Sequence, residues 1–356
     1  MGETLRVALI GAGFVARDHA AAWHAQPGAE VRCVVDADPD RARSLAAEFG
    51  VEHRDTDFGS LVGHPGIDAV DICLPPRLHL ESTCAFLAAG QHVLLEKPFV
   101  TGLEDAARML EAEQHSAATL MVAENWPFAS ATRRVRRLVD DGALGELFML
   151  RAQNESALYV EHDGEVAAAL RLSAAGGGFT MTAGVHNITL ASLLMGGIES
   201  VFAYSTERPA SPEPFLDRDV VISARFGNGG IGGMFFTGRS LHVGGRRLAF
   251  GLTGTRGTAE FDILSGSVTY TVDGERTSIE QDQPSMGFAE EIAHFCECIV
   301  DGRTPLTAAR RQLESLAAVL AVYRSLYDGR EVRPADLLAQ ADLATAVAGA
   351  GGGVDG

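Results

Sequence analysis

Three small residues, Gly11, Gly13 and Ala16, follow an apolar run at residues 7–10 and precede a segment with helical spacing. In this context Gly11 permits a tight turn, Gly13 lets a pyrophosphate approach the backbone, and Ala16 allows the helix to pack closely on the strand. The alternative is that the glycines only form the turn of an α/β unit. Strand, turn and helix together favour a dinucleotide site, with the start of the helix facing the anion. The cofactor-binding residues predicted in this turn are Gly11, Gly13, Phe14 and Val15.

An acidic residue, Asp36, ends the second apolar run, twenty residues beyond Ala16. A carboxylate at this place accepts hydrogen bonds from the ribose hydroxyls of adenosine and repels a 2′-phosphate. The sequence therefore predicts NAD in preference to NADP. Arg41, also included in the predicted cofactor site, and Arg43 lie nearby and offer the alternative of accommodating the phosphate of NADP.

Two further apolar runs end in motifs that carry a family resemblance. These are Cys73-Leu74-Pro75-Pro76-Arg77-Leu78-His79 and Glu96-Lys97-Pro98, with a glycine run at 176–178 and His186 downstream. With Glu124-Asn125, they make the chain resemble the glucose-fructose oxidoreductase and inositol dehydrogenase (Gfo/Idh/MocA) family over nearly its whole length. The resemblance implies an NAD(P)-dependent dehydrogenase or ketoreductase acting on a CH–OH carbon of a sugar, cyclitol or sugar derivative. The further cofactor-binding residues that it implies are Leu74, Pro75, His79, Glu96, Lys97 and Asn125.

Lys97 is the residue that the resemblance places at the nicotinamide and at the reacting hydroxyl of the substrate. Taking a hydride from a carbinol leaves positive character unless the hydroxyl proton departs, so an ammonium beside the oxygen and a base both lower the barrier. The alternative is an ordinary surface lysine after a strand. The carboxyl end of a parallel strand is, however, where such sheets bind ligands.

His186 is the predicted base. Family members commonly carry Asp four residues before this histidine, where it can orient the imidazole. This chain has Thr182 there, and a threonine forms hydrogen bonds but holds no negative charge. We therefore expect a weaker or differently routed proton transfer through Thr182 and His186. A purely structural histidine is the alternative.

The predicted substrate-binding residues other than Lys97 and His186 lie in the second half of the chain. Pro127 stands where relatives often place an arginine, which removes one polar contact. Trp126, which can stack on a sugar face, and Arg171, ahead of the glycine run, are the compensating candidates. Tyr159 and His162 belong to a loop expected to cover the site.

Apolar runs alternate with helical patterns over the first 125 residues, which is the rhythm of a parallel sheet with crossover helices. After a helix at 130–141, strand-like segments dominate, with a hairpin turn at 227–230, and a long helix follows at 307–327. We predict an α/β fold with a Rossmann domain at 1–124. An α+β domain with a large, mostly antiparallel open sheet follows at 125–338 and serves substrate binding and oligomerisation. Residues 339–356, rich in Ala and Gly, are expected to be disordered.

Composition excludes several classes of protein. The 356 residues carry a net charge of −18, which disfavours nucleic acid and anionic membranes as partners. The five cysteines lack paired spacing, and no run approaches the length of a membrane span, so we expect a reduced, cytoplasmic protein. The resemblance implies a homodimer or homotetramer, because open sheets of this kind pack face to face.

The sequence leaves two alternatives for the function and argues against a third. A redox-neutral enzyme would hold NAD tightly and recycle it to assist elimination, epimerisation or glycoside cleavage. A sensor would keep the dinucleotide fold without catalysis, an idea that Thr182 favours and that the presence of both Lys97 and His186 opposes. A metal-dependent hydrolase is discarded, because the chain has no HExxH and no compact cluster of carboxylates and histidines. No metal is expected.

Overall fold

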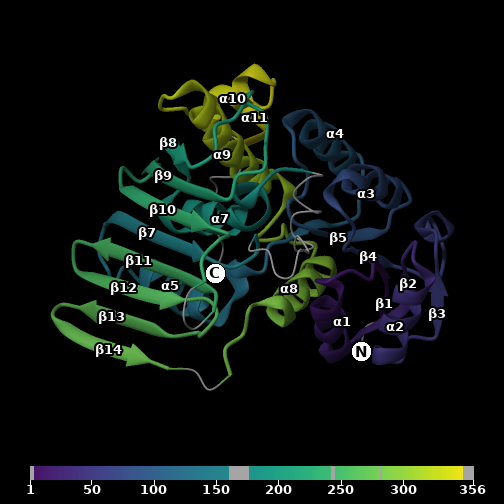
Figure 1. Ribbon diagram of the computed structural model, residues 1–356. Helices are drawn as coiled ribbons and strands as arrows, with labels where there is room; N and C mark the ends of the chain where they lie inside the picture. Colours follow the sequence, from purple (N-terminus) through teal and green to yellow (C-terminus); the bar gives the residue numbers. More distant parts are fainter. Residues whose placement is uncertain (1–3, 160–175, 242–244, 281–282, 348–356) are drawn as a thin grey trace. The chain divides into compact units, whose positions relative to one another are not determined.

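The computed structural model describes residues 4–159, 176–241, 245–280 and 283–347, and these divide into two units. The first unit comprises residues 4–100, 104–125 and 288–312, and the second comprises the remaining described residues. Residues 288–312 thus belong with the N-terminal unit, whereas the sequence assigned them to the second domain. Each unit is built around one sheet (Figure 1).

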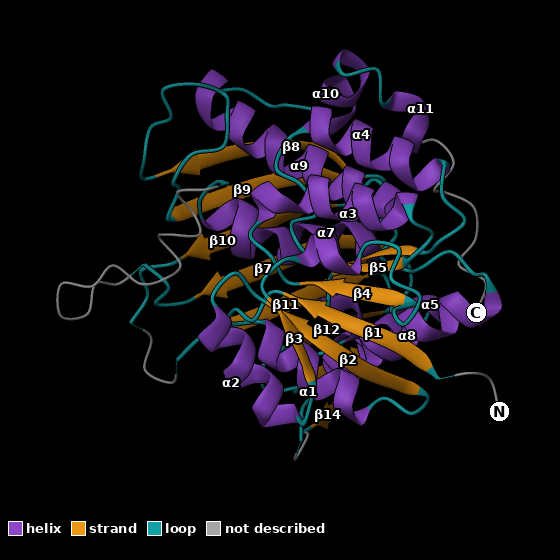
Figure 2. Cartoon of the chain, turned by 90° about the vertical axis from the view of Figure 1, so that its right-hand side faces the viewer, coloured by secondary structure: helices purple, strands orange, loops and turns teal. Residues whose placement is uncertain are grey.

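A six-stranded parallel sheet forms the core of the first unit. Its strands run in the order β3-β2-β1-β4-β5-β6, which confirms the predicted Rossmann fold. Their fanned arrangement, clearest for β1, β2 and β3, shows the twist of a parallel sheet (Figure 2). The strands are β1 (Leu5–Ile10), β2 (Ala29–Val35), β3 (His53–Asp55), β4 (Ala69–Ile72), β5 (His92–Glu96) and β6 (Leu120–Ala123). Every residue of β4 is buried, as expected of a strand covered on both faces.

Helices cover this sheet, and their ends follow from local sequence. The helix α2 begins at Pro39, after the Asp38 side chain accepts hydrogen bonds from the amides of Asp40 and Arg41. It ends at Gly50, whose φ of 68° closes the last turn. The helices of this unit are α1 (Ala16–Ala25), α2 (Pro39–Phe49), α3 (His79–Ala88), α4 (Leu103–Gln114) and α8 (Phe288–Asp301).

The helix α8 packs on α1, although about 260 residues separate them along the chain. The Trp23 and Phe295 rings meet edge to face with centroids 6.2 Å apart, and both side chains are almost fully buried. Aromatic pairs in this arrangement add about 0.5–1.5 kcal/mol beyond their buried area. The contact explains why residues 288–312 belong to the first unit.

An eight-stranded open sheet forms the second unit, in the order β14-β13-β12-β11-β7-β10-β9-β8. Only the central pair, β7 and β10, is parallel, so the predicted mostly antiparallel sheet is confirmed. The predicted turn at 227–230 joins β9 to β10. The strands are β7 (Leu147–Glu155), β8 (Ile198–Ser205), β9 (Asp219–Phe226), β10 (Ile231–Thr237), β11 (Arg247–Gly254), β12 (Gly257–Asp262), β13 (Val268–Val272) and β14 (Glu275–Ile279).

The described helices of the second unit include α5 (Ser130–Asp140), α7 (Val185–Met195) and α9 (Ala309–Asp328), which begins in the first unit. The helices α5 and α9 agree with the predicted ones to within two residues. Disorder predicted from residue 339 is wrong for residues 339–347, which include the end of α10 (Pro334–Gln340) and α11 (Ala344–Val347). Leu338 and Leu343 are buried there, which stabilises this segment. The rest of the predicted tail lies outside the described residues.

Candidate active site

The glycine turn between β1 and α1 has the geometry that its sequence requires. Gly11 has a φ of 103°, and a Cβ atom added to it would lie 2.5 Å from the carbonyl oxygen of Cys73, so only glycine fits. A Cβ atom on Gly13 would meet nothing within 4 Å, which leaves open space beside the backbone. Ala16 is fully buried at the start of α1. Phe14, in contrast, is 94% exposed.

Asp36 follows β2 and is hydrogen-bonded to the same turn. Its Oδ2 accepts from the amide of Ala12 at 2.8 Å, and its Oδ1 accepts from the amide of Asp38 at 2.9 Å. Arg41 forms an exposed ion pair with Asp38 at 3.4 Å. The carboxylate is therefore fixed beside the glycine turn, where the residues present fit a ribose next to a pyrophosphate.

The other predicted cofactor residues follow strands of the same sheet. Leu74 and Pro75 come after β4, Glu96 is the last residue of β5, and Asn125 follows β6. Since parallel strands place their carboxyl ends at one edge, this edge collects the predicted site. Glu96 and Asn125 are buried, whereas Leu74 and Pro75 are half-buried.

The predicted cofactor residue His79 has both ring nitrogens in contact with the protein's own backbone. Its side chain is fully buried, with Nδ1 3.0 Å from the carbonyl oxygen of Pro98 and Nε2 2.7 Å from that of Leu74. Burial lowers the pKa of this imidazole. Both ring nitrogens lie within hydrogen-bond distance of backbone carbonyl groups, and the predicted role of His79 at the cofactor stays a prediction. His79 ties the turn after β4 to the segment that carries Lys97.

Lys97 is half-buried directly after β5 and is the only lysine in the chain, which has 28 arginines. Arginine and lysine differ chemically, because the ammonium is a compact charge on a flexible stem and can lose its proton far more easily than a guanidinium. All the remaining Lys or Arg positions of this chain hold arginine, and the single lysine lies at the edge of the parallel sheet where such sheets bind ligands. The sequence motif had pointed to Lys97, but its being the single lysine is an independent signal.

His186 and Trp126 form a stacked pair within the second unit. Their ring centroids are 4.7 Å apart at an interplanar angle of 10°, and the side chains are 7% and 1% exposed. One face of the Trp126 indole is thus occupied by the imidazole, and the stacking of Trp126 on a sugar stays a prediction. Its packing orients His186.

Thr182 lies on the turn that leads to His186, and Tyr159 lies shortly after β7. The Thr182 hydroxyl donates to the carbonyl oxygen of Gly178 at 2.8 Å, and Tyr159 Oη lies 3.5 Å from Thr182 Oγ1. Residues 180–184 form a π-helical turn before α7, a conformation that is frequent at functional sites. The structure therefore brings Tyr159 and Thr182 together. Arg171 and His162 lie outside the described residues.

A buried carboxylate, Asp217, anchors this turn and was missed by sequence reasoning. It accepts hydrogen bonds from the amide and hydroxyl of Thr180 at 2.9 and 2.7 Å, and from Tyr323 Oη at 2.7 Å. Burial raises its pKa, against the effect of these donors. A Cβ atom on Gly178 would lie 2.1 Å from the amide nitrogen of Asp217, so glycine is required there. No local sequence signal marks Asp217, because its partners are far away in the chain.

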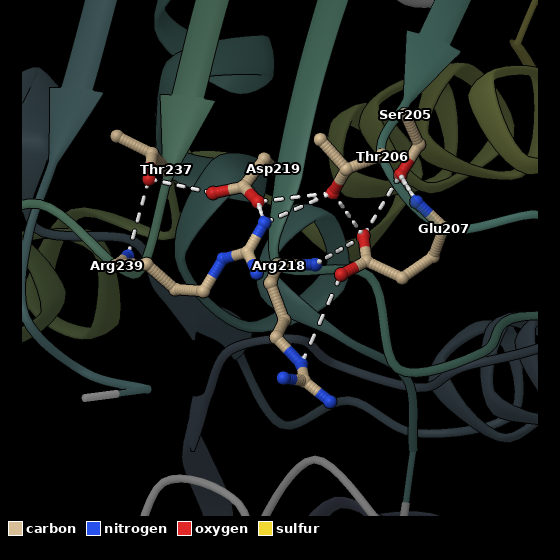
Figure 3. A network of polar contacts seen from close by, with 7 residues as sticks. All are labelled: Ser205, Thr206, Glu207, Arg218, Asp219, Thr237 and Arg239. Atoms are coloured by element: carbon tan, nitrogen blue, oxygen red, sulfur yellow. Dashed lines mark hydrogen bonds and ion pairs between the residues drawn. The ribbon is translucent and has the colours of Figure 1, made fainter. Parts of the chain in front are cut away.

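Polar side chains close to Asp217 in the sequence connect the ends of three neighbouring strands of the second sheet. Asp219 accepts hydrogen bonds from Thr237 at 2.6 Å and Thr206 at 3.0 Å, and it also pairs with Arg239. The network shown in Figure 3 consists of Ser205, Thr206, Glu207, Arg218, Asp219, Thr237 and Arg239. It fixes the ends of β8, β9 and β10 around the loop that holds Asp217.

Among the described residues, no helix is both long and apolar enough to cross a membrane.

Comparisons with known proteins agree with this geometry. The model of an oxidoreductase family with an NAD-binding Rossmann fold matches residues 5–124, and that of the Gfo/Idh/MocA C-terminal domain matches residues 132–260. D-apiose dehydrogenase of Paraburkholderia graminis is 28% identical over 95% of this chain and 92% of its own. Levoglucosan dehydrogenase of Pseudarthrobacter phenanthrenivorans is 28% identical over 73% of this chain and 74% of its own. Myo-inositol 2-dehydrogenase of Thermotoga maritima is 25% identical over 92% and 98%.

A solved structure of levoglucosan dehydrogenase, in complex with NADH and L-sorbose, superposes with a TM-score of 0.85 at 23% identity and covers 93% of this chain and 99% of that one. This likeness concerns the fold. The two family models together cover more than half of the sequence and confirm the resemblance drawn from the motifs. The chain belongs to the Gfo/Idh/MocA family of oxidoreductases, whose Rossmann domain binds NAD.

Proposed function

We propose that this protein is an NAD-dependent dehydrogenase that moves a hydride between the nicotinamide and a CH–OH or C=O carbon of a sugar or cyclitol. The observation that carries the proposal is the position of Lys97, the single lysine, at the same edge of the parallel sheet as the glycine turn and Asp36. The names of three relatives, acting on levoglucosan, D-apiose and myo-inositol, support this substrate class. These relatives are named as dehydrogenases, so the comparisons do not support the redox-neutral or sensor alternatives.

In our proposal, different residues of this chain assist the removal of the hydroxyl proton and stabilise the reacting oxygen. NAD, when bound, supplies the hydride acceptor. The Lys97 ammonium donates a hydrogen bond to the reacting oxygen, where it stabilises developing negative charge. His186 accepts the hydroxyl proton, and Trp126 keeps its ring in place by stacking. The Thr182 hydroxyl donates a hydrogen bond to the Gly178 carbonyl and so orients the turn. As a threonine, it carries no charge.

The proposal is tested by following absorbance at 340 nm with purified protein. In one assay, NAD is combined with levoglucosan, D-apiose or myo-inositol; in the other, NADH is combined with the keto form of each. We expect a substrate-dependent change sustained over many turnovers with at least one polyol. Cofactor that is bound in equal molar amount but never turns over with any member of the panel would contradict the proposed activity.

Asp36→Ala is expected to weaken the preference for NAD over NADP. The variant removes a carboxylate that repels the 2′-phosphate, and we expect about a tenfold change in the ratio of kcat/KM values, which corresponds to about 1.4 kcal/mol. Steady-state kinetics with both cofactors measure it. Glu48→Ala, an equal change of charge at the far end of α2, is the control and should leave the ratio unchanged. An unchanged ratio in Asp36→Ala would show that another residue selects the cofactor.

We also propose a homo-oligomer, dimer or tetramer, that forms through the outer face of the second sheet. Tyr204, Val221 and Phe235 are 68%, 42% and 46% exposed and lie side by side, because Tyr204 pairs with Val221 and Val221 with Phe235. A contiguous apolar face of this kind is typical of protein interfaces. A cytoplasmic location is proposed too, and the five free cysteines support it.

Phe235→Arg is expected to dissociate this oligomer, since it places a charge within the apolar face. Sedimentation velocity should show a smaller species, whereas Glu104→Arg on α4 should leave the mass of the wild type unchanged. Sedimentation of Phe235→Arg at the wild-type mass would mean that the subunits associate elsewhere.

A further inference from the structure

A buried histidine, His19, joins three elements of the first unit directly beneath the end of β5. It lies on α1, its side chain is fully buried, and its Nδ1 is 2.8 Å from Asp71 Oδ2 on β4. Its Nε2 is 3.2 Å from Oε1 of Glu96. Glu96 is the last residue of β5 and directly precedes Lys97. One imidazole thus links α1, β4 and the residue that precedes the single lysine.

The geometry defines the charge of this group. Carboxylates face both ring nitrogens, and each nitrogen needs a hydrogen in order to donate to its partner. Burial on its own would lower the pKa of His19, but the charge and hydrogen bond of Asp71 outweigh it and hold the pKa well above its ordinary value. His19 is therefore an imidazolium at neutral pH, with the hydrogens on its two ring nitrogens directed at Asp71 and Glu96.

Asp71 is the fixed end of this network. Its Oδ2 accepts a second hydrogen bond, of 2.7 Å, from Trp23 Nε1, and Asp71 is fully buried. The ring of Phe288 on α8 closes the other side of the imidazole, with centroids 5.5 Å apart. His19 consequently has little freedom to move, and Glu96 is held against a rigid group.

Glu291 on α8 adds a further acid to the surroundings of His19. It is fully buried, and neither of its carboxyl oxygens has a hydrogen-bond partner among the described residues. Burial raises its pKa well above the ordinary value. The charge of His19 acts against this, and repulsion from Glu96, Glu124 and Asp71 acts with it. Its neutral form is thus favoured, which leaves His19 as the cation between Asp71 and Glu96.

A metal ion explains this cluster less well. His19, Asp71 and Cys73 offer ligand atoms within 4.8 Å of one another. Asp71 Oδ2 is, however, already shared by His19 and Trp23, and burial raises the pKa of the Cys73 thiol far above the range in which it would become a thiolate ligand. The hydrogen-bonded form satisfies these groups without an ion.

We propose that His19 is a positioning residue for the reaction, and that by holding Glu96 against Asp71 it fixes the carboxyl end of β5 and with it the Lys97 ammonium. The inference rests on the proposed function of Lys97. Small displacements of a reacting group are costly, about 100-fold in rate for about 1 Å. A rigid, charged link one residue before Lys97 is a means of preventing such displacement.

The test uses the single lysine as a spectroscopic probe. Reductive methylation with ¹³C-formaldehyde labels only Lys97 and the N-terminal amine of the full chain. His19→Gln keeps an amide donor but removes the charge, and we expect a changed chemical shift for the Lys97 methyl groups at fixed pH. We also expect kcat to fall about 10- to 100-fold, with the Kd for NAD within about twofold of the wild type.

His115→Gln is the matched control, because it makes the same substitution at an exposed histidine outside this network, whose Nδ1 lies 2.7 Å from the carbonyl oxygen of Glu111. It should keep the Lys97 resonance and kcat near those of the wild type. Lower thermal stability in His19→Gln with an unchanged Lys97 resonance and kcat would show a merely structural role, and that outcome overturns the proposal. Because the resonance needs no turnover, it separates this failure from a failure of the proposed activity.

A measurement on the wild type covers the case in which His19→Gln does not fold. Long-range ¹H–¹⁵N spectra of the ring nitrogens should show both nitrogens of His19 protonated at pH 7. A neutral His19 at this pH would overturn the proposal, because the link to Glu96 would then lack its charge.

Discussion

Lys97→Ala is expected to lower kcat by roughly 10²- to 10⁴-fold, the range typical of losing a group that acts on the reacting oxygen. The variant deletes the ammonium but leaves Gly11, Gly13 and Asp36 unchanged, so the Kd for NAD should stay within about twofold. Stopped-flow absorbance at 340 nm measures the first quantity, and a fluorescence titration with NADH measures the second.

Two variants sharpen this experiment. Lys97→Arg keeps the charge in a larger, planar group and is expected to restore little activity, because a guanidinium differs from an ammonium in size and direction of its donors. Arg54→Ala, an exposed cation on β3, loses the same charge and should be as active as the wild type. Loss of NAD binding in Lys97→Ala with an unaltered rate per bound cofactor would remove Lys97 from the chemistry.

Gly11→Ala and Gly13→Ala are expected to separate folding from cofactor binding. In Gly11→Ala the new Cβ atom meets the Cys73 carbonyl oxygen at 2.5 Å, with a φ of 103° that disfavours any side chain. We expect a loss of more than about 2 kcal/mol in the free energy of unfolding, since the clash is with backbone. Denaturant unfolding of the protein without cofactor measures this loss.

Gly13→Ala, two residues away, should unfold like the wild type, because its Cβ atom enters open space. That space is where a pyrophosphate would approach, so the Kd for NAD should rise by about tenfold or more. Equal NAD affinity in Gly13→Ala and the wild type would place the pyrophosphate elsewhere. Wild-type stability in Gly11→Ala would show that the turn relaxes.

The sequence predicts the elements whose signals are local. The glycine turn, Asp36 and the strand before Lys97 are readable because each function depends on a few neighbouring residues. The strand β8 was not predicted, since Ile198–Ser205 mixes apolar and polar residues after Gly196-Gly197. Residue propensities alone do not determine whether such a segment forms a strand. Its pairing with β9 does.

The missed parts of the site depend on contacts between distant residues. Nothing near Trp126 reveals that His186 covers one face of its indole, and nothing near His79 reveals the carbonyl groups on both of its ring nitrogens. Asp217 is a loop residue by sequence, and its role follows only from Thr180 and Tyr323. Such roles come from tertiary packing, which local spacing does not encode.

The first unit is assembled from separate stretches of the chain, and this sets an order for its synthesis on the ribosome. Trp23 and His19 face α8, which is translated only after residues 126–287. At about 5–20 residues per second, this interval lasts roughly 10–30 s. During that time the face of α1 that later packs on α8 is exposed in the nascent chain. We therefore expect a chaperone to bind this face of α1.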